Sequence, residues 1–189
     1  MPTFAEILMN KTFICVASGP SLTEGDCTLA QRSGFPIIAV NSSWSAVPGC
    51  DHIFAADYLW WVHHFDTLVC GAKLWTQSLR AKDRYGINIF RPADSGPFNS
   101  GQRSVQLAAY LGATRVILIG YDCSLEHGPH WHGRHPVTMH NPVPREVSRW
   151  HTDFSSLVSL LPDVEIINAS RHTALTCFPH STIEAALNA

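Results

Sequence analysis

The sequence lacks several features that would place it in common functional classes. Its six cysteines form no C-x-x-C pair, which argues against a thiolate zinc site and against a disulfide framework. No apolar run approaches the roughly 20 residues that a transmembrane helix needs, and residues 1–10 carry no cationic, apolar leader. We therefore expect a cytoplasmic protein without a membrane partner.

An excess of positive charge is also absent. The 13 basic and 15 acidic residues give a formal net charge of -2, so nucleic acid is not indicated as a partner. No linker or internal repeat divides the 189 residues, of which 46% are hydrophobic. These features predict one domain over 1–189, with a core of sizeable volume.

Apolar runs alternate with helical patterns along the chain. The runs predict strands at 12–17, 35–41, 52–56, 73–76, 87–90, 115–120 and 164–168. Helical patterns begin near 22 and cover 58–65, 101–111, 145–161 and 181–187. This succession predicts an α/β fold: a Rossmann-like, doubly wound, mostly parallel sheet with helices on both faces.

The turn after the first predicted strand is the most informative local motif. Ser18, Gly19, Pro20 and Ser21 lie between an apolar run and an amphipathic segment, as in a phosphate- or nucleotide-binding turn. Glycine lets a ligand approach the backbone, and the Ser21 hydroxyl with the following amides can meet an anion. An ordinary connection between strand and helix is the alternative interpretation.

Polar residues also gather where other predicted strands end and where one helix begins. Because the carboxyl ends of parallel strands share one edge of a sheet, we expect these residues to line one nucleotide pocket. They are Asn41, Ser42, Asp57, Tyr121 and Asp122 after strands, and Asn99, Ser100 and Gly101 at the helix start. Capping of the next element is the structural alternative for both aspartates.

The aperiodic stretch 122–144 is rich in histidine, glycine and proline. A loop this long in a compact domain is usually functional, and histidines titrate close to neutral pH. The candidate catalytic residues are therefore His130, His132, His135 and Asp122. If the protein binds a divalent ion, the candidate ligands are Asp57, Asp122, His130 and His132.

Several of these elements occur in an order that resembles a known family. They are the run 16–22, Asn41, the Asn-Ser-Gly helix start at 99–101, the Gly-Tyr-Asp strand end at 120–122 and the His-Trp-His-Gly sequence at 130–133. The order is similar to that of the bacterial sialyltransferase-like group and the related archaeal 6-hydroxymethylpterin diphosphokinase-like group. Small phage and prophage proteins with the same elements are similar too. The resemblance covers residues 11–179 approximately. It is carried by the order of these motifs along the chain and by no single motif.

The resemblance implies an enzyme, a glycosyltransferase that moves a sugar from a CMP-sugar-like donor to an unidentified hydroxyl acceptor. In the sialyltransferase-like group the nucleotide contacts correspond to Gly19, Ser21, Asn41 and 99–101 of this chain, and a histidine of the late loop is the general base. Tyr121 is a shifted counterpart of the tyrosines that hold the donor phosphates. The phage proteins imply a location in the cytoplasm of an infected or lysogenic bacterium.

Other functions stay open at this point. One is a diphosphokinase that uses ATP with Mg²⁺ or Mn²⁺, in which Asp57 or Asp122 holds the metal, whereas the transferase requires no cofactor. Another is a phage module that binds a nucleotide without turnover, and a further one is a metal-dependent hydrolase built on the histidine loop. The tryptophan-rich segment 60–75 leaves a homo-oligomer open.

Overall fold

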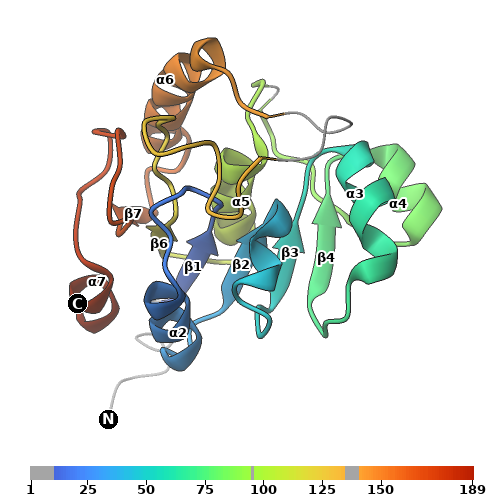
Figure 1. Cartoon of the computed structure of the whole chain (residues 1–189), viewed down its shortest axis with the longest axis horizontal. Coiled ribbons are helices and arrows are strands. Elements are labelled where there is room, and N and C mark those ends of the chain that lie inside the picture. Colours follow the sequence, from blue (N-terminus) through green and yellow to red (C-terminus); the bar gives the residue numbers. More distant parts are fainter. Residues whose placement is uncertain (1–10, 95, 135–140) are drawn as a thin grey trace.

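Seven parallel strands form one sheet within residues 11–94, 96–134 and 141–189, which the computed structural model describes (Figure 1). The strand order is β5-β4-β3-β2-β1-β6-β7. The strands are β1 (Thr12–Val16), β2 (Ile37–Val40), β3 (His52–Phe54), β4 (Lys73–Thr76), β5 (Asn88–Ile89), β6 (Arg115–Ile119) and β7 (Glu165–Asn168). Since all of them are parallel, their carboxyl ends share the upper edge of the sheet in Figure 1.

Helices cover both faces of this sheet, which confirms the predicted doubly wound α/β fold. Successive residues of β1 alternate between two apolar clusters, so that Ile14 and Val16 face one and Phe13 and Cys15 the other. The first cluster includes residues of α2 (Glu24–Arg32), α3 (Tyr58–His64), α4 (Leu79–Tyr85) and α7 (Ile183–Asn188). The second includes residues of α5 (Ser100–Tyr110) and α6 (Pro144–Leu160).

The direction of strand addition reverses between β1 and β6. The chain leaves β1 toward α2 on one face, and it leaves β6 toward the late loop and α6 on the other. The loops that follow these two strands therefore separate at their carboxyl ends. In open α/β sheets this switch point is where ligands bind.

The short helix α4 differs from the sequence expectation. No helix was predicted between the strands at 73–76 and 87–90, yet α4 forms there. Ser78 caps it by accepting a hydrogen bond from the Ala81 amide at 3.2 Å, and Gly86 ends it at φ 65. A serine cap and a left-handed glycine are standard helix boundaries, so this helix had a readable sequence signal.

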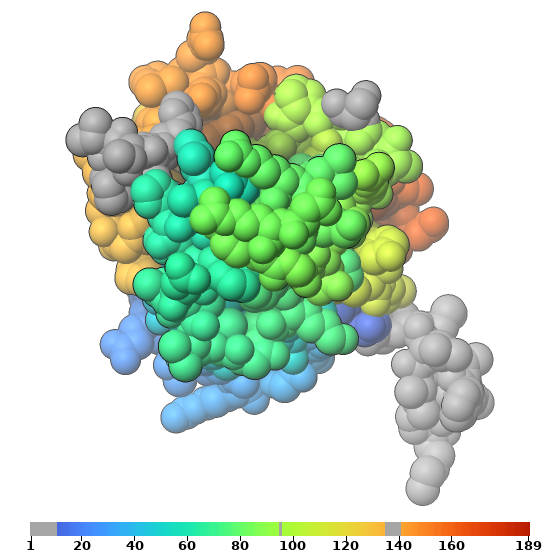
Figure 2. Space-filling view, turned by 90° about the vertical axis from the view of Figure 1, so that its right-hand side faces the viewer, coloured from blue at the N-terminus to red at the C-terminus, as the bar shows by residue number. Residues whose placement is uncertain are grey.

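The tryptophans of segment 60–75, which were considered as a contact for a homo-oligomer, are largely covered by this chain itself. Trp60 is 3% exposed and Trp61 is fully buried, and Trp75 is half-buried. Figure 2 shows this side of the molecule covered by the outer surfaces of α3 and α4. None of the described helices combines the length and the apolar character that crossing a membrane requires.

Candidate functional site

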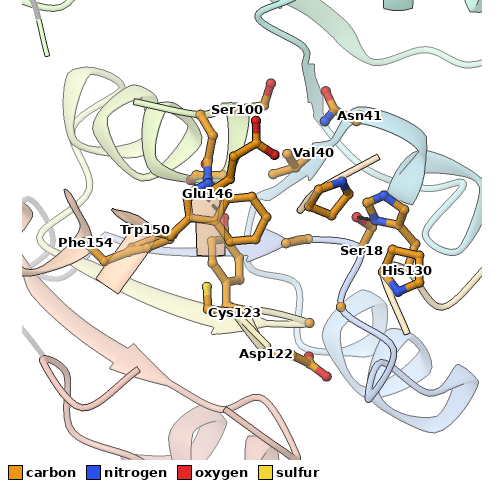
Figure 3. A pocket seen from close by; sticks show the side chains of 18 of the residues that line it. Ser18, Val40, Asn41, Ser100, Asp122, Cys123, His130, Glu146, Trp150 and Phe154 are labelled. Carbon is orange, nitrogen blue, oxygen red and sulfur yellow. Dashed lines mark hydrogen bonds between the residues drawn. The ribbon is translucent and has the colours of Figure 1, made fainter. Parts of the chain in front are cut away.

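A cavity of about 420 Å³ opens at the carboxyl edge of the sheet, beside the switch point (Figure 3). Pockets of about 300–1,000 Å³ are typical for small-molecule ligands. The predicted site residues in its wall are Ser18, Gly19, Pro20, Asn41, Asp57, Asn99, Ser100, Gly101, Tyr121, Asp122 and His130. Segments far apart in the sequence thus converge on one crevice, whereas Ser21, Ser42 and His132 are not in the wall.

The turn after β1 directs its donors toward the protein itself. The amide and the hydroxyl of Ser21 donate to the two carboxylate oxygens of Asp122 at 2.8 and 2.7 Å. The Gly19 amide donates to the Gly120 carbonyl at 2.7 Å. This differs from the expectation that these groups face a bound anion, because the anion that Ser21 meets is the Asp122 carboxylate.

The two glycines of this region are required by close packing between the ends of β1 and β6. A Cβ atom on Gly19 would lie 2.1 Å from Asp122 Oδ1 and 2.5 Å from the Gly120 oxygen. Gly120 has φ +71, and its Cβ would lie 2.5 Å from the Ala17 oxygen. Gly19 therefore allows contact with the neighbouring chain segment, where the sequence predicted contact with a ligand.

The N-terminus of α2 is also occupied by protein groups. Thr23 caps the helix by accepting from the Asp26 amide at 3.2 Å, and the Asp26 carboxylate accepts from the Thr23 hydroxyl at 2.7 Å. Arg171 pairs with the same carboxylate at 2.9 Å. The capping box and the ion pair engage these side chains, and no residue of α2 is in the cavity wall.

The start of α5 also has a capping box, but its first residues line the cavity. Asn99 and Gln102 form a reciprocal capping box: the Gln102 amide donates to Asn99 Oδ1 at 3.0 Å, and the Asn99 amide to Gln102 Oε1 at 2.7 Å. Among the described residues, no group accepts a hydrogen bond from the amides of Ser100 and Gly101, which line the cavity. Such amides at a helix N-terminus favour an anion.

The Ser100 hydroxyl has a structural role. It accepts a hydrogen bond from the Ala56 amide at 3.1 Å, and the residue is 6% exposed. This bond ties the start of α5 to the segment that follows β3.

Ser18 and His130 form a polar pair in the cavity wall. Ser18 Oγ lies 2.8 Å from His130 Nδ1, and the Trp131 amide donates to the Ser18 carbonyl at 2.9 Å. The His130 ring stacks on the ring of His132 with 5.1 Å between centroids and 9° between planes. Burial lowers the pKa of His132, which lies behind His130 and outside the cavity wall.

These positions separate the three candidate bases. Of the described ones, His130 reaches the cavity and His132 supports its ring. The remaining candidate, His135, lies outside the residues that the structure describes. His130 is therefore the candidate that the geometry favours as a proton carrier.

Tyr121 and Asp122 serve the scaffold. The Tyr121 hydroxyl lies 2.8 Å from Ser104 Oγ and donates to the Gly101 carbonyl at 3.2 Å, so it supports α5 and does not offer its hydroxyl to donor phosphates. Burial raises the pKa of Asp122, against the opposing effects of the Ser21 hydrogen bonds and the His172 charge. In Figure 3 Asp122 lies opposite Ser100 and Asn41.

Asn41 brings an unsatisfied acceptor to the cavity. Its backbone is left-handed, with φ 50, a conformation that asparagine tolerates better than most residues. Its Oδ1 atom is buried and accepts no hydrogen bond from the described residues. A buried polar group without a partner costs about 1–3 kcal/mol. Its neighbour Ser42 instead accepts from Trp60 Nε1 at 3.3 Å.

The candidate metal ligands do not form a cluster. Within 11–94, 96–134 and 141–189, no three His, Cys, Asp or Glu side chains are grouped so that they could hold a metal ion. Asp57 is exposed at the start of α3, where its side chain makes no capping hydrogen bond. Asp122 is bound to Ser21.

Sequence reasoning missed a group of wall residues on α6 and before α5. Glu146, Trp150 and Phe154 line the cavity from one face of α6, and Phe98 lines it from the loop before α5. The spacing of four residues along α6 was a readable signal, since such residues share a helix face. The position of Phe98 had no comparable signal, because it lies in an irregular loop.

The charge of the wall is predominantly negative. Its described residues include three carboxylates, those of Asp57, Asp122 and Glu146, and one guanidinium, that of Arg149. Arg149 also pairs with Asp153 at 3.4 Å. Lysine and arginine side chains therefore provide little of the positive potential in this cavity, and the backbone amides of α5 provide the main site for an anion.

Comparison with known proteins gives no match: no family model, curated protein or solved structure is significantly similar to this chain. The resemblance in the order of short motifs is thus without support from an overall match. The function must be argued from the geometry and chemistry of the cavity.

Proposed function

We propose that this protein is a nucleotide-dependent transferase that moves a group, most simply a sugar, from a nucleotide donor to a hydroxyl acceptor. The observation that carries the proposal is one cavity that contains both the open amides of Ser100 and Gly101 and the Ser18–His130 pair. The amides can hold an anionic leaving group, and the histidine can accept a proton. A transferase of this kind needs these two functions next to each other.

The electrostatics favour a donor with one phosphate. Two helix N-terminal amides and a single arginine oppose three carboxylates in the wall, which is too little positive charge for a triphosphate without an added cation. A nucleoside monophosphate-sugar brings one negative charge to this site. This agrees with the CMP-sugar donor that the motif order implies.

His130 acts as general base in the proposed reaction. Because His130 Nε2 is buried, we take the tautomer in which the Ser18 hydroxyl donates to Nδ1: Ser18 Oγ takes the proton of the acceptor hydroxyl while its own proton passes to Nδ1. The acceptor oxygen then bonds to the anomeric carbon of the sugar. The bond between that carbon and the donor phosphate oxygen breaks, and the nucleoside monophosphate leaves with the electron pair while the α5 amides stabilise its charge.

A ligand panel followed by an activity assay tests the proposal. The panel measures the thermal shift with CMP, UDP, GDP, ADP and ATP, each with and without Mg²⁺ or Mn²⁺. A selective shift with CMP or UDP supports glycosyl transfer, whereas a shift only with ATP and Mg²⁺ would move the assignment to pyrophosphoryl transfer. Absence of any nucleotide shift would overturn the proposal.

The second step measures release of the nucleotide leaving group, CMP or the nucleoside diphosphate, from the sugar nucleotide that the panel selects, with water as acceptor. His130→Ala is expected to lower the rate by about 10²- to 10⁴-fold and to leave nucleotide affinity nearly unchanged. His127→Ala is the matched control, because His127 is exposed and lies outside the cavity wall. Equal rates for the two variants would exclude His130 as the base.

A further inference from the structure

Phe98 forms a partition between two hollows of the molecule. The cavity shares Pro97 and Phe98 with a neighbouring open groove of about 530 Å³ at the ends of β4 and β5. Arg103, on the first turns of α5, lines the groove but not the cavity. Phe98 therefore borders both hollows, whereas Arg103, which contacts its ring, lines only the groove.

The guanidinium of Arg103 lies over the Phe98 ring, 4.7 Å from its centroid. Arg103 is 3% exposed and makes a forked set of hydrogen bonds: Nη1 donates to both oxygens of Asp94 at 3.0 and 2.9 Å, and Nη2 donates to the Gly96 carbonyl. Nη1 also donates to Gln106 Oε1 at 2.6 Å. The guanidinium plane is thus held in one orientation behind the ring.

Asp94, the carboxylate that accepts from Arg103, is held by further hydrogen bonds. It accepts from Gln106 Nε2 at 2.6 Å and from the Gly96 amide at 3.0 Å, in addition to Arg103. Burial acts to raise the pKa of Asp94, but these hydrogen bonds and the Arg103 charge outweigh it and lower the pKa. The loop that carries Phe98 is therefore bound to α5 by a charged, hydrogen-bonded clamp.

This arrangement gives Phe98 the properties of a stacking platform. A cation over one face of an aromatic ring draws electron density toward it, so the opposite face attracts an electron-rich planar ring more strongly. Phe98 is also two residues before Ser100, whose amide is the anion site of the cavity. A base on Phe98 and a phosphate at the start of α5 would be held by consecutive parts of one rigid turn.

The other aromatic residues of the wall suit this role less well. Phe154 is 1% exposed, and its ring packs edge-on against Tyr121 and Phe178 with centroids 5.8 and 6.2 Å away. Trp150 lies on α6, and none of the described cations lies over its ring. Among the wall residues that the structure describes, Phe98 alone combines a cavity position, a cation over the ring and proximity in the chain to the anion site.

We propose that the planar base of the nucleotide stacks on Phe98 and that Arg103 is a positioning residue that holds and polarises this ring. The proposal rests on the proposed function, because it assumes a nucleotide whose phosphate binds at the start of α5. It assigns the base to the wall before α5 and leaves the α6 side of the cavity to the transferred group and the acceptor.

The test compares the affinity for CMP with that for ribose 5-phosphate, which carries a phosphate and a ribose but no base. Phe98→Ala is expected to weaken CMP binding by about tenfold and to leave ribose 5-phosphate binding unchanged, because it removes only stacking. Phe98→Trp should retain CMP binding. Arg103→Lys keeps the charge beside Asp94 but loses the planar fork, and it is expected to weaken CMP binding by about threefold.

A double variant distinguishes positioning from a direct contact. If Arg103 acts through Phe98, Arg103→Lys adds no further loss of CMP binding to Phe98→Ala. Tyr85→Ala is the matched control: Arg84 lies over the Tyr85 ring at 5.2 Å, and this pair on α4 is outside the cavity wall. The control should bind both ligands like the unmodified protein.

The outcomes separate this proposal from the proposed function. If the unmodified protein binds neither of these ligands and no nucleotide of the panel, both proposals are overturned. If it binds CMP and Phe98→Ala leaves the ratio of the two affinities unchanged, only the stacking proposal is overturned. If Trp150→Ala weakens CMP binding relative to ribose 5-phosphate binding and Phe98→Ala does not, the base stacks on α6 instead. Phe98→Ala and Phe98→Trp decide the matter even if Arg103→Lys does not fold.

Discussion

The turn after β1 and the start of α5 lie at the same edge of the sheet and meet negative charge in different ways. Ser21 in the first turn already binds a carboxylate, that of Asp122, through its amide and its hydroxyl. In the second turn, the amides of Ser100 and Gly101 have no acceptor among the described residues and line the cavity. A polar turn at a helix start is thus a ligand site only where the protein itself provides no anion.

A carboxylate lies beside each of the two turns, and the two carboxylates differ in the direction of their pKa shift. Asp122 is buried against the β1 turn, and burial raises its pKa. Asp94 is held beside α5 by hydrogen bonds and Arg103, which outweigh burial and lower its pKa. The first carboxylate replaces an external ligand, whereas the second supports the loop that forms the cavity wall.

The largest effect is expected when the glycine of each turn is replaced by alanine, because only the β1 turn packs closely against other backbone. Gly19→Ala is expected to lower the free energy of unfolding by about 3 kcal/mol or more, because the new methyl group would meet Asp122 and the Gly120 backbone. At Gly101 the nearest atoms to an added Cβ are Asn99 Oδ1 at 3.1 Å and Tyr121 at 3.3 Å, so Gly101→Ala should cost about 1 kcal/mol or less. Urea denaturation of both variants measures this. Similar losses would contradict the close packing at Gly19.

A smaller effect is expected from Ser21→Ala. It removes the hydroxyl bond to the Asp122 carboxylate and should lower the free energy of unfolding by about 2 kcal/mol. Since Ser21 lies outside the cavity wall, CMP affinity should stay the same. Weaker CMP binding by a folded Ser21→Ala protein, measured by calorimetry, would show that the β1 turn contacts the ligand after all.

At the other turn, Asn99→Ala should affect both properties. Loss of the N-cap is expected to lower the free energy of unfolding by about 1 kcal/mol. Fraying of the first turn should also weaken CMP binding by about threefold, because the Ser100 and Gly101 amides lose their fixed direction. Asn99→Ser, which keeps a capping oxygen, serves as the control. Unchanged CMP affinity in Asn99→Ala would argue against the amides as the phosphate site.

The smallest expected effect is on the pH dependence of stability. Since the folded-state pKa of Asp94 is lowered, its charge stabilises the fold above about pH 4, and this advantage over Asp94→Asn decreases as the pH falls further. The raised pKa of Asp122 changes the stability with pH in the opposite direction. The stability of the unmodified protein relative to Asp122→Asn should fall as the pH rises above about 4, until it passes the raised pKa. Unfolding free energies between about pH 3.5 and 7 measure both slopes, and slopes of equal sign would contradict the comparison.

Much of the fold could be predicted because its signals are local. The apolar runs at 12–17 and 115–120 correspond to β1 and β6, which are fully buried, and the amphipathic pattern at 145–161 corresponds to α6 within one residue at each end. Apolar runs of this kind are buried whatever their position in the sheet, so their burial can be predicted from the sequence alone. The helix α4 was missed because it is short and charged, and only its caps at Ser78 and Gly86 identify it.

The candidate site was predicted in part for a similar reason. Ser18, Asn41, Asp57 and 99–101 meet in one cavity because the carboxyl ends of parallel strands share an edge. Ser21 and Tyr121 were expected to contact a nucleotide, but their polar groups have partners more than 15 residues away in the chain. Phe98 was missed because its role depends on Arg103 behind it.

The sequence by itself determined the parallel sheet, the helices on both faces and the edge at which polar residues gather, since periodicity and apolar runs act over neighbouring residues. Only the tertiary structure decided which of those residues face the cavity. Hydrogen-bond donors at a turn are used by whichever acceptor the fold brings closest, and a carboxylate from position 122 reaches the turn at 21 only after β1 and β6 have paired. The availability of a donor is therefore a property of long-range packing.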